Sequence, residues 1–426
     1  MNEFLLQFIW QHKLFDTSKT LKTIDGKPVV IVNAGLLNSN AGPDFLEAKI
    51  IIDDTLWAGH VELHLKSSDW KKHHHQKDKK YNNLILHVVY EFDGDVETEN
   101  KTHFPSIGLK GYTHTDLLTK YDSLLTKQPF IACEKLINQV STLTIVQQKE
   151  RMLIERLEQK TDRIAHLLKQ YKQNWQEVFY IELARAFGIQ INQDAFEKVA
   201  LHTPFNLFAK HKLNIIQIEA ILFGQAGFLN EYFDDAYPNH LSAEYTALKK
   251  KYQLHGIDKS QWKFLRLRPA NFPTLRIAQF AQLLYQSTHL FSQILEAKNV
   301  AEIEKLFQVT VSSYWLQHYT FQEISSARNK SLGQSFIHII IINCIVPMIF
   351  LYGKMQGKEN LCKHAIELLK QIPSEQNSII TKWQNLGIEM QHAEDSQALL
   401  QLKKHYCDAK KCLQCSIGYA VLKLKV

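Results

Sequence analysis

Two acidic residues near the N-terminus have the spacing of a site for a divalent cation. Asp44 follows Pro43 at the start of one strand-like run, and Glu62 lies in the middle of the next run. Carboxylates on neighbouring strands can face the same side of a sheet, and one or two of them, with water and phosphate oxygens, are enough to hold Mg²⁺. We therefore predict that Asp44 and Glu62 bind Mg²⁺, which would activate water and neutralise charge on a phosphate under attack.

A histidine extends this candidate catalytic set. His64 lies two positions after Glu62, and side chains alternate along a strand, so both should point to the same face. Its imidazole could orient or deprotonate the water, or bind the metal ion itself. A hydrolase that uses a different metal ion through its histidines is therefore another interpretation. In the later histidine run, we expect His73 and His74 to be surface residues rather than ligands.

The segment 66–80 is rich in positive charge. It contains six lysines against two aspartates, which suits the phosphate backbone of a nucleic acid. Its aromatic residues can stack on bases, and residues spaced three apart would lie on one side of a helical turn. The predicted nucleic-acid contacts here are Trp70, His75, Asp78 and Tyr81. Arginine forks also suit phosphate, so Arg266 and Arg268 in a later proline-rich loop complete this predicted set.

These side chains require a sheet to position them. Apolar residues at helical spacing predict a helix over the first fifteen residues. Four runs rich in Val, Ile, Leu and Tyr follow, and each is typical of a strand; they span 27–35, 45–53, 56–65 and 83–92. The second and third runs are separated by a short turn and should pair as an antiparallel hairpin. A short helix or ordered loop should precede the fourth run, and a further strand is expected within 103–111.

The remainder of the chain predicts helices. From about residue 117, apolar residues recur at intervals of three and four between charged positions. We therefore predict an α+β protein, with a mixed sheet and flanking helices in a domain at 1–125 and a large all-α domain at 126–426.

The motifs and the order of elements resemble the restriction-endonuclease-like PD-(D/E)xK phosphodiesterase superfamily. "GPDF" supplies Pro43 and Asp44, and "VELH" supplies Glu62 and His64. The resemblance implies a nuclease-like sheet in which Asp44 and Glu62 bind Mg²⁺. It also implies assistance from an acid in the first helix, which Glu3 matches.

The sequence departs from that superfamily where a lysine is expected. His64 occupies the lysine position, so catalysis would be weakened, moved to Lys66 or lost. The alternative function is a non-catalytic nucleic-acid-binding or scaffolding protein with a degenerate nuclease fold. Nearly the whole chain also resembles an uncharacterised bacterial family known as a domain of unknown function, through "GPDF", "VELH", "SDW" and "RPANFP", and this resemblance implies no activity.

A group of cysteines near the C-terminus has metal-ligand spacing. Cys407, Cys412 and Cys415 form a C-x4-C-x2-C pattern, which could hold Zn²⁺ or an iron–sulfur cluster. Both usually require four ligands, and the candidates for the fourth are Cys133, Cys344, Cys362 and His405. Free thiols that pack as small apolar side chains are the alternative.

Composition limits the remaining classes. The 426 residues carry a formal charge of +7, which permits an acidic partner, and six cysteines in so long a chain favour a reducing cytoplasm. The apolar stretch 335–353 is interrupted by His338, Asn343 and Pro347, so we expect a buried helix and no membrane association. No glycine-rich phosphate loop, HExxH or G-x-S-x-G motif supports a kinase, dehydrogenase, zincin or serine hydrolase. The sequence indicates no specific protein partner.

Overall fold

The computed structural model describes residues 1–16, 18–38, 41–96, 104–125, 130–287, 289–321 and 323–424, with only the backbone of Gln76. The chain forms two compact units: Met1–Gln148 with Leu402–Val426, and Lys149–Gln401. The division thus lies later than residue 125. The C-terminal segment also returns to the first unit, which the local pattern of the sequence could not indicate.

The first unit contains a mixed sheet, which confirms the predicted α+β class. Its order is β1-β3-β4-β5-β6, with β2 paired to β3. The three strands β1, β3 and β4 are antiparallel, whereas β4, β5 and β6 are parallel. The predicted hairpin is confirmed by the pairing of Ile52 with Thr55. The strand bounds are β1 Val29–Asn33, β2 Leu36–Leu37, β3 Phe45–Ile52, β4 Thr55–Lys66, β5 Leu84–Glu91 and β6 Ser106–Gly108.

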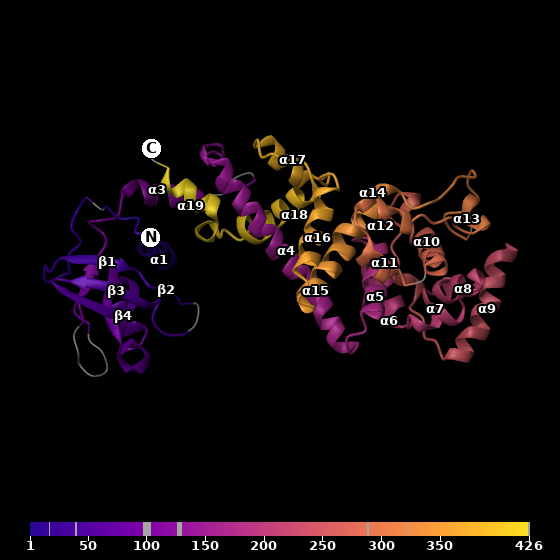
Figure 1. Ribbon diagram of the computed structural model, residues 1–426, viewed down its shortest axis with the longest axis horizontal. Coiled ribbons are helices and arrows are strands. Elements are labelled where there is room, and N and C mark those ends of the chain that lie inside the picture. The colour runs from indigo at the N-terminus through magenta and orange to yellow at the C-terminus, as the bar shows by residue number, and fades with distance from the viewer. Residues whose placement is uncertain are drawn as a thin grey trace. The chain divides into compact units, whose positions relative to one another are not determined.

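The first helix, α1 (Glu3–Gln11), packs against β4 (Figure 1). It begins at Asn2, whose side chain accepts a hydrogen bond from the Leu5 N–H and so satisfies one of the free N–H groups of the first turn. Its buried residues are Leu5, Leu6, Phe8, Ile9 and Trp10. Glu3 and Gln7 are partly exposed, and the Phe4 side chain is exposed.

The connection between β4 and β5 is a broken helix. It consists of α2 (Asp69–Lys72) and two 3₁₀ turns, His75–Lys77 and Lys79–Tyr81. His74 has a left-handed backbone with φ +60°, and Asp78 is extended, so the continuous helical turn predicted through His75, Asp78 and Tyr81 is wrong. Beneath this connection lies a buried cluster of Trp70, Tyr81, Leu84, Val96 and Phe104.

Segments far apart in the sequence complete the first unit. The helix α3 (Thr115–Leu125) contacts α19 (Ser416–Lys423), and the two lie side by side in Figure 1. The Tyr419 ring also packs against Phe8 and His12 of α1, with ring centroids 5.7 and 4.6 Å apart. The other elements of this part are the 3₁₀ turns Ile137–Gln139 and Cys412–Gln414 and the π-helical turn Lys403–Cys407.

The second unit is helical. The long helix α4 (Thr142–Gln170) starts in the first unit and continues into the second. Two 3₁₀ turns, Lys259–Gln261 and Pro269–Asn271, lie between α9 and α10. The other helices are α5 Trp175–Phe187, α6 Gln193–Leu201, α7 Asn206–Lys210, α8 Ile215–Gln225, α9 Ala236–Tyr252, α10 Pro273–Gln286, α11 Leu290–Glu296, α12 Val300–Leu306, α13 Ser313–Gln317, α14 Gln334–Ile340, α15 Val346–Met355, α16 Glu359–Lys370, α17 Ser378–Asn385 and α18 Ala393–Leu402.

The apolar stretch of the sequence forms one long helix within this unit. It runs through α14, a π-helical turn (Ile341–Ile345) and α15, and by length and composition it could cross a membrane. However, 78% of its most apolar window is buried inside the protein. Such burial is typical of the core helix of a globular protein and agrees with the predicted buried helix.

Candidate metal centre

Asp44 and Glu62 lie side by side, as the hairpin predicts. Asp44 immediately precedes β3, Glu62 is in the middle of β4, and the next pair of residues, Phe45 and Val61, face each other across the two strands. The Asp44 N–H donates to Glu62 Oε2 over 2.9 Å, and the Leu63 N–H donates to Asp44 Oδ2 over 3.0 Å. Backbone donors from two strands therefore fix both carboxylates.

The first helix completes the surroundings of this carboxylate pair. Gln7 Nε2 donates to Asp44 Oδ1 over 2.9 Å. One helical turn earlier, the charge of Glu3 adds to the increase in the pKa of both Asp44 and Glu62. The acid expected from the first helix is therefore close to the pair.

Burial makes negative charge at this pair costly. It raises the pKa of Asp44 to about 7, with a further contribution from the Glu62 carboxylate, and it raises the pKa of Glu62 to about 8. Only 5% of the Glu62 surface is exposed. A divalent cation would offset the repulsion between these two carboxylates, so the donor set fits a metal ion.

Two histidines lie next to the other oxygen of Glu62, and a third contacts one of them. His75 Nε2 lies 3.2 Å and His64 Nε2 lies 3.7 Å from Glu62 Oε1. His64 Nε2 is also 3.1 Å from His73 Nδ1. One ring nitrogen from each of these histidines lies within 4.8 Å of the others, and this is the one such group of three found among the described residues.

These separations match the coordination shell of a single ion. Ligand atoms bound at about 2.1 Å in a tetrahedral shell lie about 3.4 Å from one another. The three measured separations, 3.1, 3.2 and 3.7 Å, lie on either side of that value. The three histidines could therefore bind one divalent ion, and Glu62 Oε1 lies next to two of them, His64 and His75.

A fourth histidine orients the central one. His87, on the neighbouring parallel strand β5, places its Nε2 2.8 Å from His64 Nδ1. Burial lowers the pKa of His64 to about 2 and that of His87 to about 3, so both rings are neutral and one donates to the other. When His64 Nδ1 is the donor, the lone pair of its Nε2 faces Glu62 and the other histidines. A metal-bound imidazole usually donates its second ring N–H to an acceptor such as a carboxylate or a backbone carbonyl, and here a histidine would supply that acceptor.

Several predicted residues do not join this centre. Trp70 is 0% and Tyr81 5% exposed, so their predicted role in stacking on bases is wrong, because both rings are packed into the core below the centre. Tyr81 instead packs on His75, with ring centroids 4.1 Å apart. Asp78 accepts a hydrogen bond from the Lys80 N–H and caps a 3₁₀ turn. Lys66 is exposed at the end of β4 and contributes to lowering the pKa of Asp93.

The two predicted arginines belong to the helical unit. Arg266 and Arg268 are both exposed, and the second precedes the 3₁₀ turn at Pro269. Their contact with nucleic acid stays a prediction. The nearby Arg276 is structural, because it lies 3.4 Å from the centre of the Phe336 ring and is buried.

His73 is exposed, as predicted, but sequence reasoning missed its contact with His64 and missed His87 altogether. His87 lies opposite Glu62 across the parallel β4–β5 pair, a register that needs the intervening connection to be known. The contact of His73 with His64 depends on the left-handed backbone at His74, which the sequence did not indicate. The H-x-H spacing of His73 and His75 was the available signal for a metal centre.

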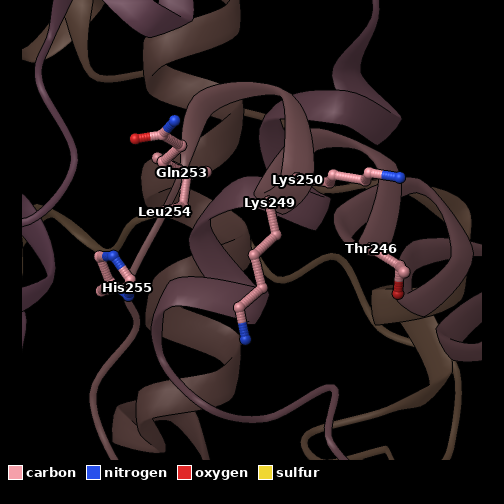
Figure 2. Close-up of a pocket in the computed structure, with 6 residues that line it drawn as sticks. All are labelled: Thr246, Lys249, Lys250, Gln253, Leu254 and His255. Carbon is pink, nitrogen blue, oxygen red and sulfur yellow. The ribbon is translucent and has the colours of Figure 1, made fainter.

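The helical unit contains a separate open cavity, shown in Figure 2. Its volume is about 540 Å³, and its lining residues are Thr246, Lys249, Lys250, Gln253, Leu254 and His255. Lys250 and His255 point to opposite sides of the view in Figure 2. No predicted site residue is among them, so this cavity adds nothing to the metal centre.

The comparison with protein families covers most of the chain. A family model described as "Protein of unknown function (DUF2851)" matches residues 3–378. The chain belongs to this family. The matched range contains all the residues of the metal centre but ends before Cys407. No curated protein and no solved structure matches the chain.

Proposed function

We propose that this member of the DUF2851 family is a metal-dependent phosphodiesterase that acts on nucleic acid. One observation carries the proposal: Glu62 faces Asp44 through one carboxylate oxygen and His64 and His75 through the other, and these two histidines form a possible metal-binding group with His73. Imidazole ligands favour a transition metal such as Zn²⁺ at the histidine side. The Asp44–Glu62 side keeps the oxygen ligands that the predicted Mg²⁺ would prefer.

The charge around the centre supports a phosphate substrate. Lysines of the β4–β5 connection are exposed around a buried, acidic and imidazole-rich centre; they are Lys71, Lys72, Lys77, Lys79 and Lys80. Lys72 is paired with Asp69 at 2.5 Å, which leaves the others to attract a polyanion. When a metal ion is bound it would polarise phosphate and activate water. Glu62 and the histidines would hold it in place.

The order of the secondary-structure elements also supports a nuclease-like function. The chain forms a helix, three antiparallel strands, a connection with a short helix, and then a parallel strand. Asp44 and Glu62 lie at the positions that the PD-(D/E)xK resemblance implies. His64, in the lysine position, is 1% exposed and contacts His73 and His87. We therefore assign it to metal binding rather than to the role of the lysine.

The test is metal-dependent cleavage with a control variant next to the ligands. Untagged protein is assayed with Mg²⁺, Mn²⁺ and Zn²⁺ on single-stranded, double-stranded and branched DNA and on RNA. We expect Glu62→Gln and His75→Asn to lower cleavage at least about 100-fold, because loss of a partner that only supports a metal ligand already costs about 10–100-fold. His74→Asn should keep full activity, because His74 lies outside the cluster and asparagine tolerates its left-handed backbone.

Other outcomes separate the alternatives. Binding of nucleic acid without cleavage under any metal would favour the non-catalytic binding protein. Cleavage that survives in both ligand variants would contradict the proposed centre.

A further inference from the structure

Four cysteines from distant parts of the chain line one small cavity in the first unit. Cys133 lies in the segment after α3, Cys407 ends a π-helical turn, and Cys412 and Cys415 flank the 3₁₀ turn before α19. The cavity measures about 20 Å³, and its other lining residues are Ala132, Tyr406, Lys411 and Gly418. All six cysteines of the chain are free thiols.

The four thiols are near enough to influence one another. Besides burial, Cys415 and Cys412 raise the pKa of Cys133, and Cys133, Cys415 and Cys412 raise the pKa of Cys407. Thiols that repel one another as anions in a buried place would be stabilised by a cation. Cys344 and Cys362 take no part, since both belong to the helical unit.

The backbone holds the C-x2-C pair in a fixed loop. The Cys415 N–H donates to the Cys412 carbonyl over 3.2 Å, which closes a turn between them. Gly418, in α19, packs so closely that a Cβ there would lie 2.2 Å from the Cys412 carbonyl oxygen. Helix α19 therefore packs directly against the loop that carries Cys412 and Cys415.

We propose that Cys133, Cys407, Cys412 and Cys415 bind one Zn²⁺ ion. Four thiolates are a usual ligand set for structural zinc, and this set supplies the fourth ligand that the C-terminal pattern lacks. A cavity needs roughly 10–15 Å³ to hold one water molecule. The cavity between the cysteines has room for a single ion. No three of the four sulfur atoms lie within 4.8 Å of one another among the described residues, so Zn²⁺, bound at about 2.3 Å from each thiolate, would draw them together.

Nearby lysines fit the charge of such a site. Four thiolates and one Zn²⁺ carry a net charge of −2. Lys403 lowers the pKa of Cys407, Lys410 lowers that of Cys412, and Lys411 lines the cavity. These positive charges oppose the effect of burial on the thiols and would stabilise the bound form.

The ion would hold the C-terminal segment in place against the first helix. Tyr419 of α19 packs on Phe8 and His12 of α1, and the 3₁₀ turn at Cys412 also contacts α1. On the same helix, Gln7 donates to Asp44. The zinc site thus has a structural role, distinct from the chemistry of the metal centre.

The test uses the full chain, purified without a tag, with His73→Asn and His75→Asn present so that the histidine centre does not contribute zinc. We expect one Zn²⁺ per chain, released as four thiols react with a mercurial reagent. Co²⁺ substitution should give an intense near-ultraviolet thiolate-to-cobalt band. Cys133→Ser and Cys412→Ser should lose the ion and the band, whereas Cys362→Ser should keep both.

Three results would overturn the zinc site. They are iron with acid-labile sulfide, a disulfide among the four cysteines in freshly purified protein, and cysteines that all react at once while no zinc is released. The cobalt spectrum of the protein with all its cysteines reports on the ligands directly, so it decides the matter even if the serine variants fail to fold.

Discussion

At the scale of single residues, the proposed function depends on which groups surround Glu62. Its two oxygens face different partners, Asp44 on one side and His64 with His75 on the other. A lysine in the position of His64 would bring a positive charge against this group, whereas a neutral imidazole brings a metal ligand. The histidine that weakens the likeness to PD-(D/E)xK enzymes would therefore add a ligand to the proposed metal centre.

His87 should affect metal binding without touching the ion. Replacing it by phenylalanine keeps the ring volume but removes the hydrogen bond to His64 Nδ1. We expect His87→Phe to weaken Mn²⁺ or Zn²⁺ binding about 10–100-fold, as loss of such supporting contacts does. His87→Gln should recover part of it, because its oxygen can accept the same hydrogen bond. Calorimetric titration of metal into each variant measures the effect, and equal affinities would contradict it.

Glu219 in the helical unit should make stability depend on pH. Burial raises its pKa to about 7, although Ser312 and Tyr237 donate hydrogen bonds to it. Because the folded state holds this proton more tightly than the unfolded state, stability falls as pH rises from about 4.5 to 7 and stays low above that.

Glu219→Gln should remove this penalty. At pH 8 we expect its free energy of unfolding to exceed that of the unmodified protein by up to about 3 kcal/mol, at 1.36 kcal/mol for each unit of pKa shift. The difference should shrink towards pH 4.5. Denaturant titrations at several pH values provide the measurement, and a difference that is constant with pH would contradict the prediction.

At the scale of elements, the sequence predicts those contacts that depend on the local pattern of residues. The hairpin of β3 and β4 follows from two alternating runs and a short turn, and it brings Asp44 to Glu62. The approach of His73 and His87 depends instead on a left-handed residue at His74 and on a parallel pairing with β5. Both depend on how distant segments pack, which no single run of sequence specifies. The burial of Trp70 was missed for the same reason, since Phe104 and Val96 cover it from later in the chain.

The packing of α19 on the cysteine loop should tolerate no added side-chain atom. Gly418→Ala would place a Cβ against the backbone of Cys412, and such overpacking usually costs about 1–3 kcal/mol. Gly111→Ala, in the same unit, would meet no atom within 4 Å and is the matched control. We expect only Gly418→Ala to lower the melting temperature. Equal melting temperatures for the two variants would show that α19 does not pack in this way.

At the scale of the whole molecule, the helical unit is an insertion. The chain leaves the first unit along α4 and returns to it after α18. Side chains of these two helices contact each other: Lys149 pairs with Asp395 at 2.5 Å, and Arg156 donates a hydrogen bond to Gln397. Joining residue 148 to residue 402 by a short Gly/Ser linker should therefore leave a folded first unit that still binds metal at Glu62. Circular dichroism and metal titration of the shortened chain check this, and an unfolded product would show that the helical unit is required.

The same connectivity determines the order in which the two units are synthesised and can fold on the ribosome. Residues 149–401 are synthesised before residues 402–424, and domains fold as units while the chain emerges. The first unit therefore emerges without α19 and three of the four cysteines, and the contacts of α19 with α1 and α3 form only after the helical unit has been synthesised. The helical unit can thus fold before the first unit is complete.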